Sequence, residues 1–317
     1  QSSLAASYEI RVKSSYDLSK NIFVLKEGIL TTPFGGPFQM SGQYNAVRNY
    51  LDEAYIKSES LKLDALPQYV LFFGQILPVN LGFSGVSRLD LFAKGDVKLF
   101  ELNAKIDSTQ ATLTYSKYFS KSPGTPFIFR SDLQLAVGTI LRGSFSLEMD
   151  QAALKGSIVD WDLGSGKGEF TLLTNKFDLA GWEKYFPPFR DLTFSGSLKC
   201  LFSARGNLNR ISESQMMTNL TLDRIGVKTV NGAMIRNVRG SLDTGPLDSE
   251  LKKINFEIGD SSFTADGKMF LRPETKWLIQ VRSPEFNLKN LIQNLKGLTE
   301  AVQLEDWKID WKSIEQS

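Results

Sequence analysis

The chain has 317 residues, of which 42% are apolar and 23% charged, and its 37 Lys+Arg nearly balance its 35 Asp+Glu, for a net charge of +2. These proportions exclude wholesale disorder, and the balanced charge argues against nucleic acid as a partner, because nucleic-acid binding requires a concentrated basic face. The absence of histidine and the single cysteine, Cys200, exclude the usual general base, the usual metal ligand, Ser-His and Cys-His dyads and an internal disulfide.

Most of the chain alternates between apolar and polar residues. This period of two is typical of strands with one dry and one wet face. Turn-forming pairs separate the alternating stretches, and they include Pro123-Gly124, Asn231-Gly232, Gly245-Pro246 and Asp266-Gly267. We therefore predict a mostly β fold, in which repeated antiparallel strands form an extended curved sheet or groove. The stretches that alternate are 8–12, 100–106, 145–149, 194–204, 254–258 and 276–282.

Three segments have helical spacing instead. Asp64, Asp178 and Asn287 can each cap a short helix, and the third carries an apolar stripe from Leu288 to Leu298. The second is stopped by Pro187-Pro188. We expect each helix to cap an edge or end of the sheet. The longest apolar run, 69–77, is too short to cross a membrane.

The helix and the strand after it recur along the chain. Phe194-Ser195-Gly196 stands 111 residues after Phe83-Ser84-Gly85, and Ala204-Arg205-Gly206 stands 111 residues after Ala93-Lys94-Gly95. Because a repeat of this length predicts stacked units, we divide the chain into a first unit at 1–100, a second at 101–206, and a third at 207–317 that includes the truncated start of a fourth. We expect the chain to be a segment of a longer protein.

Three short patterns resemble catalytic motifs but fit structural roles better. Gly164-Ser165-Gly166-Lys167-Gly168 lacks the spacing of a phosphate loop and predicts a hairpin turn. Ser249 and Lys252 match a Ser-x-x-Lys pattern inside a strand context, and Asp160 and Asp162 flank a tryptophan just before the glycine turn. We expect no enzymatic activity, no cofactor and no metal.

The sequence at 176–292 resembles the AsmA-like family of bacterial envelope proteins, which includes TamB-like members. The resemblance rests on the order of several weak features: a D-L helix after a strand, a small-Gly-x-Leu strand, the stretch Asn237-Val238-Arg239-Gly240-Ser241-Leu242, and a strand with the F-x-A-x-G-K pattern at 263–268. It extends partially to 56–106 and 263–311.

This resemblance implies a function in lipid movement. The family is similar to bridge-like lipid transfer proteins, in which a long β-sheet forms an apolar groove, so the resemblance implies a periplasmic module that shields phospholipid acyl chains between the inner and outer membranes of a diderm bacterium. It also implies envelope membrane proteins as partners and tethering to the inner membrane by a segment absent from this chain. The alternating faces provide candidate lipid-binding residues: Phe145, Leu147, Met149, Phe194, Leu198, Phe202, Ile254, Phe256, Ile258, Phe263, Met269, Trp277, Ile279 and Val281.

Two alternatives remain open at this stage. The apolar faces could instead pack together as the dry core of a closed sandwich, which is a common fate of alternating strands. The protein would then be a structural envelope scaffold or an assembly factor for outer-membrane proteins. A glycan hydrolase on a β scaffold is a further alternative, although no paired acidic motif supports it.

Overall fold

The computed structural model describes residues 8–32, 35–65, 80–136, 139–208, 210, 214–246, 248–270 and 276–302. It confirms the predicted fold class: the protein is mostly β, and its antiparallel strands form an open sheet that does not close on itself. The chain divides into two units. Unit 1 comprises Gln1–Ser116, Lys121–Phe170 and Arg205–Glu213, and unit 2 comprises Lys117–Ser120, Thr171–Ala204 and Ser214–Ser317.

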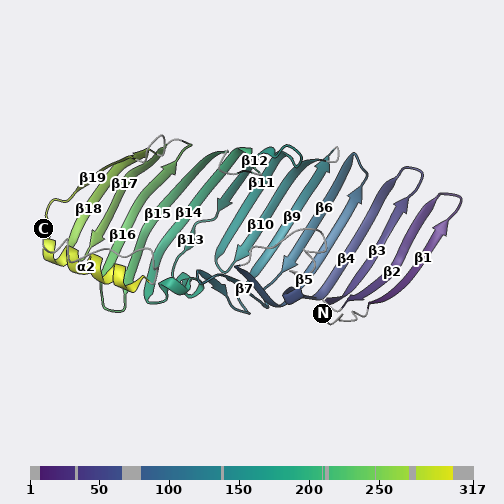
Figure 1. The fold of residues 1–317 in the computed structure, drawn as a ribbon, viewed down its shortest axis with the longest axis horizontal. Coiled ribbons are helices and arrows are strands. Elements are labelled where there is room, and N and C mark those ends of the chain that lie inside the picture. Colours follow the sequence, from purple (N-terminus) through teal and green to yellow (C-terminus); the bar gives the residue numbers. More distant parts are fainter. Residues whose placement is uncertain are drawn as a thin grey trace, which may run out of the picture. The chain divides into compact units, whose positions relative to one another are not determined.

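Unit 1 is an antiparallel ladder in which most strands pair with their neighbours in sequence (Figure 1). The pairing order is β1-β2-β3-β4-β5-β6-β9-β10-β11, and β7 pairs with the first part of β5. The strands are β1 (Glu9–Asp17), β2 (Ile22–Thr32), β3 (Gly35–Asn45), β4 (Tyr50–Lys62), β5 (Leu81–Gly95), β6 (Leu99–Asp107), β7 (Ala111–Tyr115), β9 (Phe127–Ala136), β10 (Ile140–Met149) and β11 (Ala152–Asp162).

Unit 2 contains a second ladder, β15-β16-β17-β18-β19, in which every pair is antiparallel. Its strands are β13 (Phe177–Asp178), which pairs with β14, and β15 (Gln215–Thr229), β16 (Met234–Thr244), β17 (Asp248–Ile258), β18 (Ser261–Phe270) and β19 (Lys276–Arg282). Three strands have residues in both units: β8 (Phe119–Lys121), β12 (Lys167–Thr174) and β14 (Leu192–Asn207).

The C-terminal helix forms as predicted. α2 (Leu288–Ala301) begins after Asn287, whose side-chain oxygen accepts a hydrogen bond from the Asn290 backbone N–H at 3.1 Å. The Asn294 side chain accepts from Met234 N–H, and Asn287 N–H donates to the Ser261 hydroxyl, so the helix lies across the turn ends of β16 and β18. α2 therefore caps one end of the strands of unit 2 (Figure 1).

The other two predicted helices differ from the expectation. The segment after Asp178 forms only two 3-10 turns, η2 (Trp182–Tyr185) and η3 (Pro187–Phe189). Gly181, just before η2, has a left-handed φ of 81°, and Pro187 and Pro188 follow one residue after η2. An α-helix therefore cannot extend through this segment. Near Asp64, the structure shows the 3-10 turn η1 (Leu63–Ala65), and the rest of the predicted helix lies outside the described residues.

One predicted turn is wrong. Asp266-Gly267 lies in the middle of β18. A Cβ at Gly267 would stand 2.5 Å from the Leu278 carbonyl oxygen of β19, so this glycine serves the close approach of two strands. Asp266 accepts a hydrogen bond at 2.8 Å from Lys253 N–H, at an irregularity in the β17–β18 register where Lys253 has a φ of 48°.

Candidate apolar groove

The strand registers place apolar residues on one side of unit 1. Residues opposite each other in an antiparallel ladder point to the same face, and from β5 to β11 one such face is made of partners that are almost all apolar or small. We name this set the unit 1 apolar face: Leu89, Leu91 and Ala93; Phe100, Leu102, Ala104 and Ile106; Phe129, Ser131, Leu133 and Leu135; Leu141, Phe145, Leu147 and Met149; Ala152, Leu154, Gly156 and Ile158.

The opposite side of unit 1 carries ion pairs between neighbouring strands. These include Lys57–Asp90 at 3.8 Å, Lys94–Glu101 at 2.9 Å and Arg130–Glu148 at 2.5 Å. The six side chains are 29–58% exposed, so water screens each pair and each adds little stability. The ion pairs instead help to fix the strand register, because a one-residue slip would turn these charges onto the apolar face.

An aromatic row crosses the unit 1 apolar face. The Phe145 ring stacks with Phe129 and Phe170, at centroid distances of 6.1 and 5.7 Å. Beneath it, Gly156 leaves room for the ring, since a Cβ there would collide with the Phe145 Cζ. The ring thus covers a bare stretch of backbone on β11, and the row gives this face a fixed surface.

Unit 2 has the same one-sided distribution. Phe256 and Phe263 are register partners and stack at 5.3 Å, and Met269 pairs with Trp277. The unit 2 apolar face follows from the four registers: Leu220, Leu222, Ile225 and Val227; Ile235, Val238 and Leu242; Leu251, Ile254, Phe256 and Ile258; Phe263, Ala265 and Met269; Trp277, Ile279 and Val281. The other side holds charged groups such as Lys252, which lies 2.6 Å from Asp243 and 3.4 Å from Glu250.

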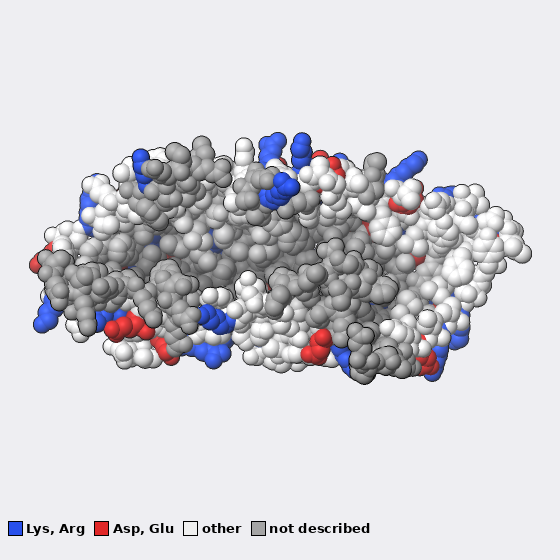
Figure 2. All heavy atoms as spheres, in the orientation of Figure 1, with Lys and Arg blue, Asp and Glu red and all other residues white. Residues whose placement is uncertain are grey.

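Most residues of these apolar faces are only partly buried in the part of the chain that the structure describes. Of the unit 1 set, only Met149 and the small residues Ser131 and Gly156 are buried. In unit 2, Ile258, Phe263 and Ala265 are buried, whereas Ile279 and Val281 on β19 remain 43% and 54% exposed. A sandwich core would bury such residues almost completely. Charged atoms in Figure 2 lie mainly toward the margins of the visible face.

The structure brings together eleven of the fourteen candidate lipid-binding residues as members of these two faces. Phe145, Leu147 and Met149 belong to the unit 1 apolar face, and the eight from Ile254 to Val281 belong to the unit 2 apolar face. The other three lie on β14: Phe194, Leu198 and Phe202.

An aromatic cluster covers the first part of β14 within unit 2. The ring centroids of Phe194 and Phe189 of η3 are 6.0 Å apart. Leu198 is the register partner of Phe177 on β13, and the ring centroids of Phe177 and Trp182 are 5.0 Å apart. Tyr185 and Phe186 complete the cluster around Trp182. Phe194 and Leu198 thus pack beneath the 3-10 turns, while Phe202 stands further along the strand and is half-buried.

Several residues of the apolar faces escaped the sequence prediction. Leu89, Leu133 and Leu220 are examples, and they show the same period-two alternation as the candidate lipid-binding residues. In β15 the signal is interrupted, because Arg224 has a φ of 53° and inserts an extra residue between Leu222 and Ile225. The bulge preserves the face in space while it breaks the alternation in sequence.

The residues of the three motif-like patterns are held in contacts within the sheet and its turns. Asp160 pairs with Arg142 across β10 and β11, and Asp162 accepts from the Gly164 N–H at 2.9 Å in the predicted hairpin turn. Ser249 lies on the opposite side of β17 from Lys252, whose ammonium pairs with Asp243. Burial raises the pKa of the Cys200 thiol, which disfavours a reactive thiolate.

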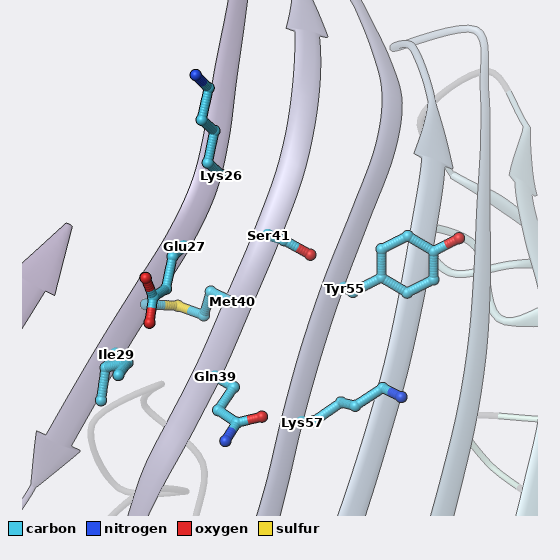
Figure 3. Close-up of a pocket in the computed structure, with 9 residues that line it drawn as sticks. Lys26, Glu27, Ile29, Gln39, Met40, Ser41, Tyr55 and Lys57 are labelled. Carbon is cyan, nitrogen blue, oxygen red and sulfur yellow. The ribbon is translucent and has the colours of Figure 1, made fainter. Parts of the chain in front are cut away.

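A hollow on the charged side of unit 1 offers no better site. It encloses about 460 Å³ between β2, β3 and β4 and is lined by Glu27, Met40, Tyr55 and Lys57, among others (Figure 3). Glu27 is already paired with Lys13 at 2.6 Å, and Lys57 lies 3.8 Å from Asp90. The β2–β3 register shifts beside this hollow, between Leu25 and Gly28, and two of its charged groups are already paired with other residues of the sheet.

The described residues offer neither a metal site nor a membrane-spanning helix. They contain no group of three or more His, Cys, Asp or Glu side chains placed to hold a metal ion. Within the same ranges, no helix has the length and apolar character needed to span a bilayer. Comparison with known proteins finds no matching family model, no matching curated protein and no matching solved structure.

Proposed function

We propose that the protein is a lipid-binding and lipid-transport module whose apolar faces shield phospholipid acyl chains. The observation that carries the proposal is that each unit presents an apolar face by strand register, and that most residues of these faces stay partly exposed within the described ranges. Large contiguous apolar patches are rare on soluble proteins and mark sites that bind an apolar partner. The resemblance of 176–292 to AsmA-like proteins favours a lipid as that partner, and transport between the inner and outer membranes as its purpose.

The chemistry of the faces suits acyl chains. Their residues in register offer methyl, methylene and aromatic surface and no charge. Each methylene transferred from water contributes about 0.8 kcal/mol, so roughly ten methylenes would offset the cost of association without a head-group site. Such binding is unselective along the face, which allows a lipid to move along it.

Extraction of the purified protein with organic solvent, followed by mass spectrometry, tests the proposal directly. We expect bound phospholipid. Leu147→Asp and Phe256→Asp place a carboxylate on each apolar face and should abolish co-purification of lipid. Their matched controls, Ser146→Asp and Asn255→Asp, change the adjacent residue on the opposite side of the same strand and should retain lipid.

Unfolding measurements separate a groove from a closed core. An uncovered face leaves the new carboxylate in water, so Leu147→Asp should cost only the lost packing, about 1–2 kcal/mol, whereas a dry core would lose several kcal/mol. A parent protein without lipid, together with global unfolding of Leu147→Asp, would contradict the proposal and favour a dry scaffold.

A further inference from the structure

Four hairpin turns share one end of the strands in unit 1. They join β1 to β2 (18–21), β3 to β4 (46–49), β5 to β6 (96–98) and β11 to β12 (163–166). Each follows a strand that runs in the same direction through the antiparallel ladder, so all four turns lie along one margin (Figure 1). We call this margin the hairpin rim.

Each turn of the hairpin rim presents an aliphatic side chain to solvent. Leu18 is 81% exposed, Val47 71%, Val97 74% and Leu163 43%. The first three are among the four most exposed large hydrophobic residues in the described chain. At the opposite margin of unit 1, the described turns are polar or proline-rich, as at 108–110, 122–126 and 150–151. Among the turns that the structure describes in unit 1, these aliphatic side chains therefore lie on one margin.

The four exposed aliphatic side chains, which we call the aliphatic tips, belong to turns that hydrogen bonds hold rigid. In each case a strand-end Asp or Asn accepts a hydrogen bond from the turn backbone: Asp17 from Ser19 N–H (2.9 Å), Asn45 from Arg48 N–H (3.0 Å), Asp96 from Lys98 N–H (2.8 Å) and Asp162 from Gly164 N–H (2.9 Å). Such side-chain to backbone bonds fix a turn without other packing. The chain thus holds four apolar groups in water on preformed supports, at little ordering cost on binding.

Basic residues flank three of these tips. Lys20, Arg48 and Lys98 follow Leu18, Val47 and Val97 within two residues. Lys20 lies 4.0 Å from Asp17, and Arg48 lies 3.1 Å from Asp52, so the cations are partly balanced. An aliphatic tip with a cation beside it matches the interface of a bilayer, where the apolar group enters the acyl boundary and the charge stays among head-group phosphates.

We propose that the hairpin rim of unit 1 docks on a phospholipid bilayer surface, with Leu18, Val47, Val97 and Leu163 inserted between head groups. The first three hairpins are two strands apart, or about 10 Å, and the fourth is four strands further along, or about 19 Å. The tips would therefore enter a fluid surface as separate small anchors. A protein partner would need a matching row of pockets. The inference does not depend on lipid in the apolar faces.

Vesicle flotation tests this docking surface. We expect the full chain to float with phosphatidylcholine vesicles, with a modest gain when phosphatidylglycerol is added. Leu18→Ser/Val47→Ser/Val97→Ser should lower partitioning by about tenfold or more, since three inserted aliphatic groups are lost. The matched control, Val230→Ser/Leu278→Ser, removes side chains that are 80% and 66% exposed in unit 2 and should float like the parent.

Each other outcome overturns the proposal. A parent that does not float, or a triple variant that floats as well as the parent, rules out docking through these tips. Capture of a protein that depends on the tips, without flotation of the parent, assigns the rim to a protein partner instead. Because the substituted side chains are exposed, the melting temperature should not change, and lipid co-purifying with the apolar faces should be the same in parent and variant. Failure of either proposal is thus distinguishable from failure of the other.

Discussion

At the scale of single residues, the buried side chain of Lys121 holds the chain segment at 108–111 in place. Its side chain is completely buried, and its ammonium donates to the backbone carbonyls of Ser108, Thr109 and Ala111 at 2.7, 2.8 and 2.7 Å. All three donors of the ammonium therefore have an acceptor. Burial lowers the pKa of Lys121, with Asp107 opposing that shift. The Lys-Ser-Pro-Gly sequence around it predicts only a solvated turn, so this role is not visible without the fold.

Removal of the ammonium should therefore destabilise unit 1. Lys121→Met removes three charge-assisted hydrogen bonds, while the Ser108 and Thr109 carbonyls keep the Ala111 and Gly124 N–H groups as donors. We expect a loss of about 3 kcal/mol in the free energy of unfolding. Lys155→Met, an exposed position on β11, serves as the control and should change it by less than about 0.5 kcal/mol. Chemical denaturation of both variants provides the comparison. Equal effects would mean that the three hydrogen bonds contribute nothing specific.

At the scale of elements, the repeated strand has the same backbone conformation in both copies. Gly85 of β5 has a φ of 88°, and Gly196 of β14 has 83°. Gly95 and Gly206, at the ends of the same strands, have 125° and 130°. The F-S-G and [Lys/Arg]-G signals in the sequence thus correspond to left-handed positions that a side chain would strain. The local likeness of the two strands follows from sequence alone.

Gly196 also lies against a neighbouring strand, which allows a sharp test. A Cβ there would collide with the Arg224 carbonyl oxygen, whereas Gly232 has a similar φ of 86° and no atom within 4 Å. Gly232→Ala should cost about 1 kcal/mol for its backbone alone, and Gly196→Ala about 3 kcal/mol or more. Thermal unfolding of the two variants would measure the difference. Equal costs would show that β14 moves away from β15 without penalty.

The capped turns of the hairpin rim predict a pH dependence. Side-chain and backbone hydrogen bonds lower the pKa of Asp17, Asp96 and Asp162 below the ordinary value of about 3.9. A carboxylate whose pKa is lower in the folded state contributes stability above its unfolded pKa and loses it as the pH falls through the folded value. The turns should therefore loosen only below about pH 4.

Amide replacement should weaken that dependence. Asp17→Asn/Asp96→Asn/Asp162→Asn keeps an acceptor in each turn but removes the titrating group. We expect the fall in melting temperature between neutral pH and pH 3 to be smaller in this variant than in the parent. Glu53→Gln, on β4, is the control and should leave the fall as it is. An undiminished fall in the triple variant would assign acid sensitivity to other groups.

At the scale of the whole molecule, the fold class could be predicted from the sequence, whereas the full set of residues on each apolar face could not. Strict alternation at 145–149 and 254–258 indicated the correct side for each residue, because no irregularity interrupts those stretches. Bulges such as the one at Arg224 shift the parity, and their position depends on pairing with a strand far along the chain. The second predicted helix did not form, although Leu179, Trp182 and Phe186 have helical spacing. A helix this short has little stability of its own. The free energy gained by packing Trp182 against Phe177 and Phe186 in the aromatic cluster therefore decides the local conformation.

The open ladder has a consequence for how such a chain can change length. In an antiparallel meander, a duplication or deletion of one hairpin leaves every later strand in its original direction and every later turn on its original margin. A change by a single strand would reverse both, moving the aliphatic turns to the opposite margin. Gene variants that differ by whole hairpins should thus remain functional with a longer or shorter apolar face, whereas single-strand variants should be lost by selection. The number of strands is then a quantity that evolution can adjust in steps of two.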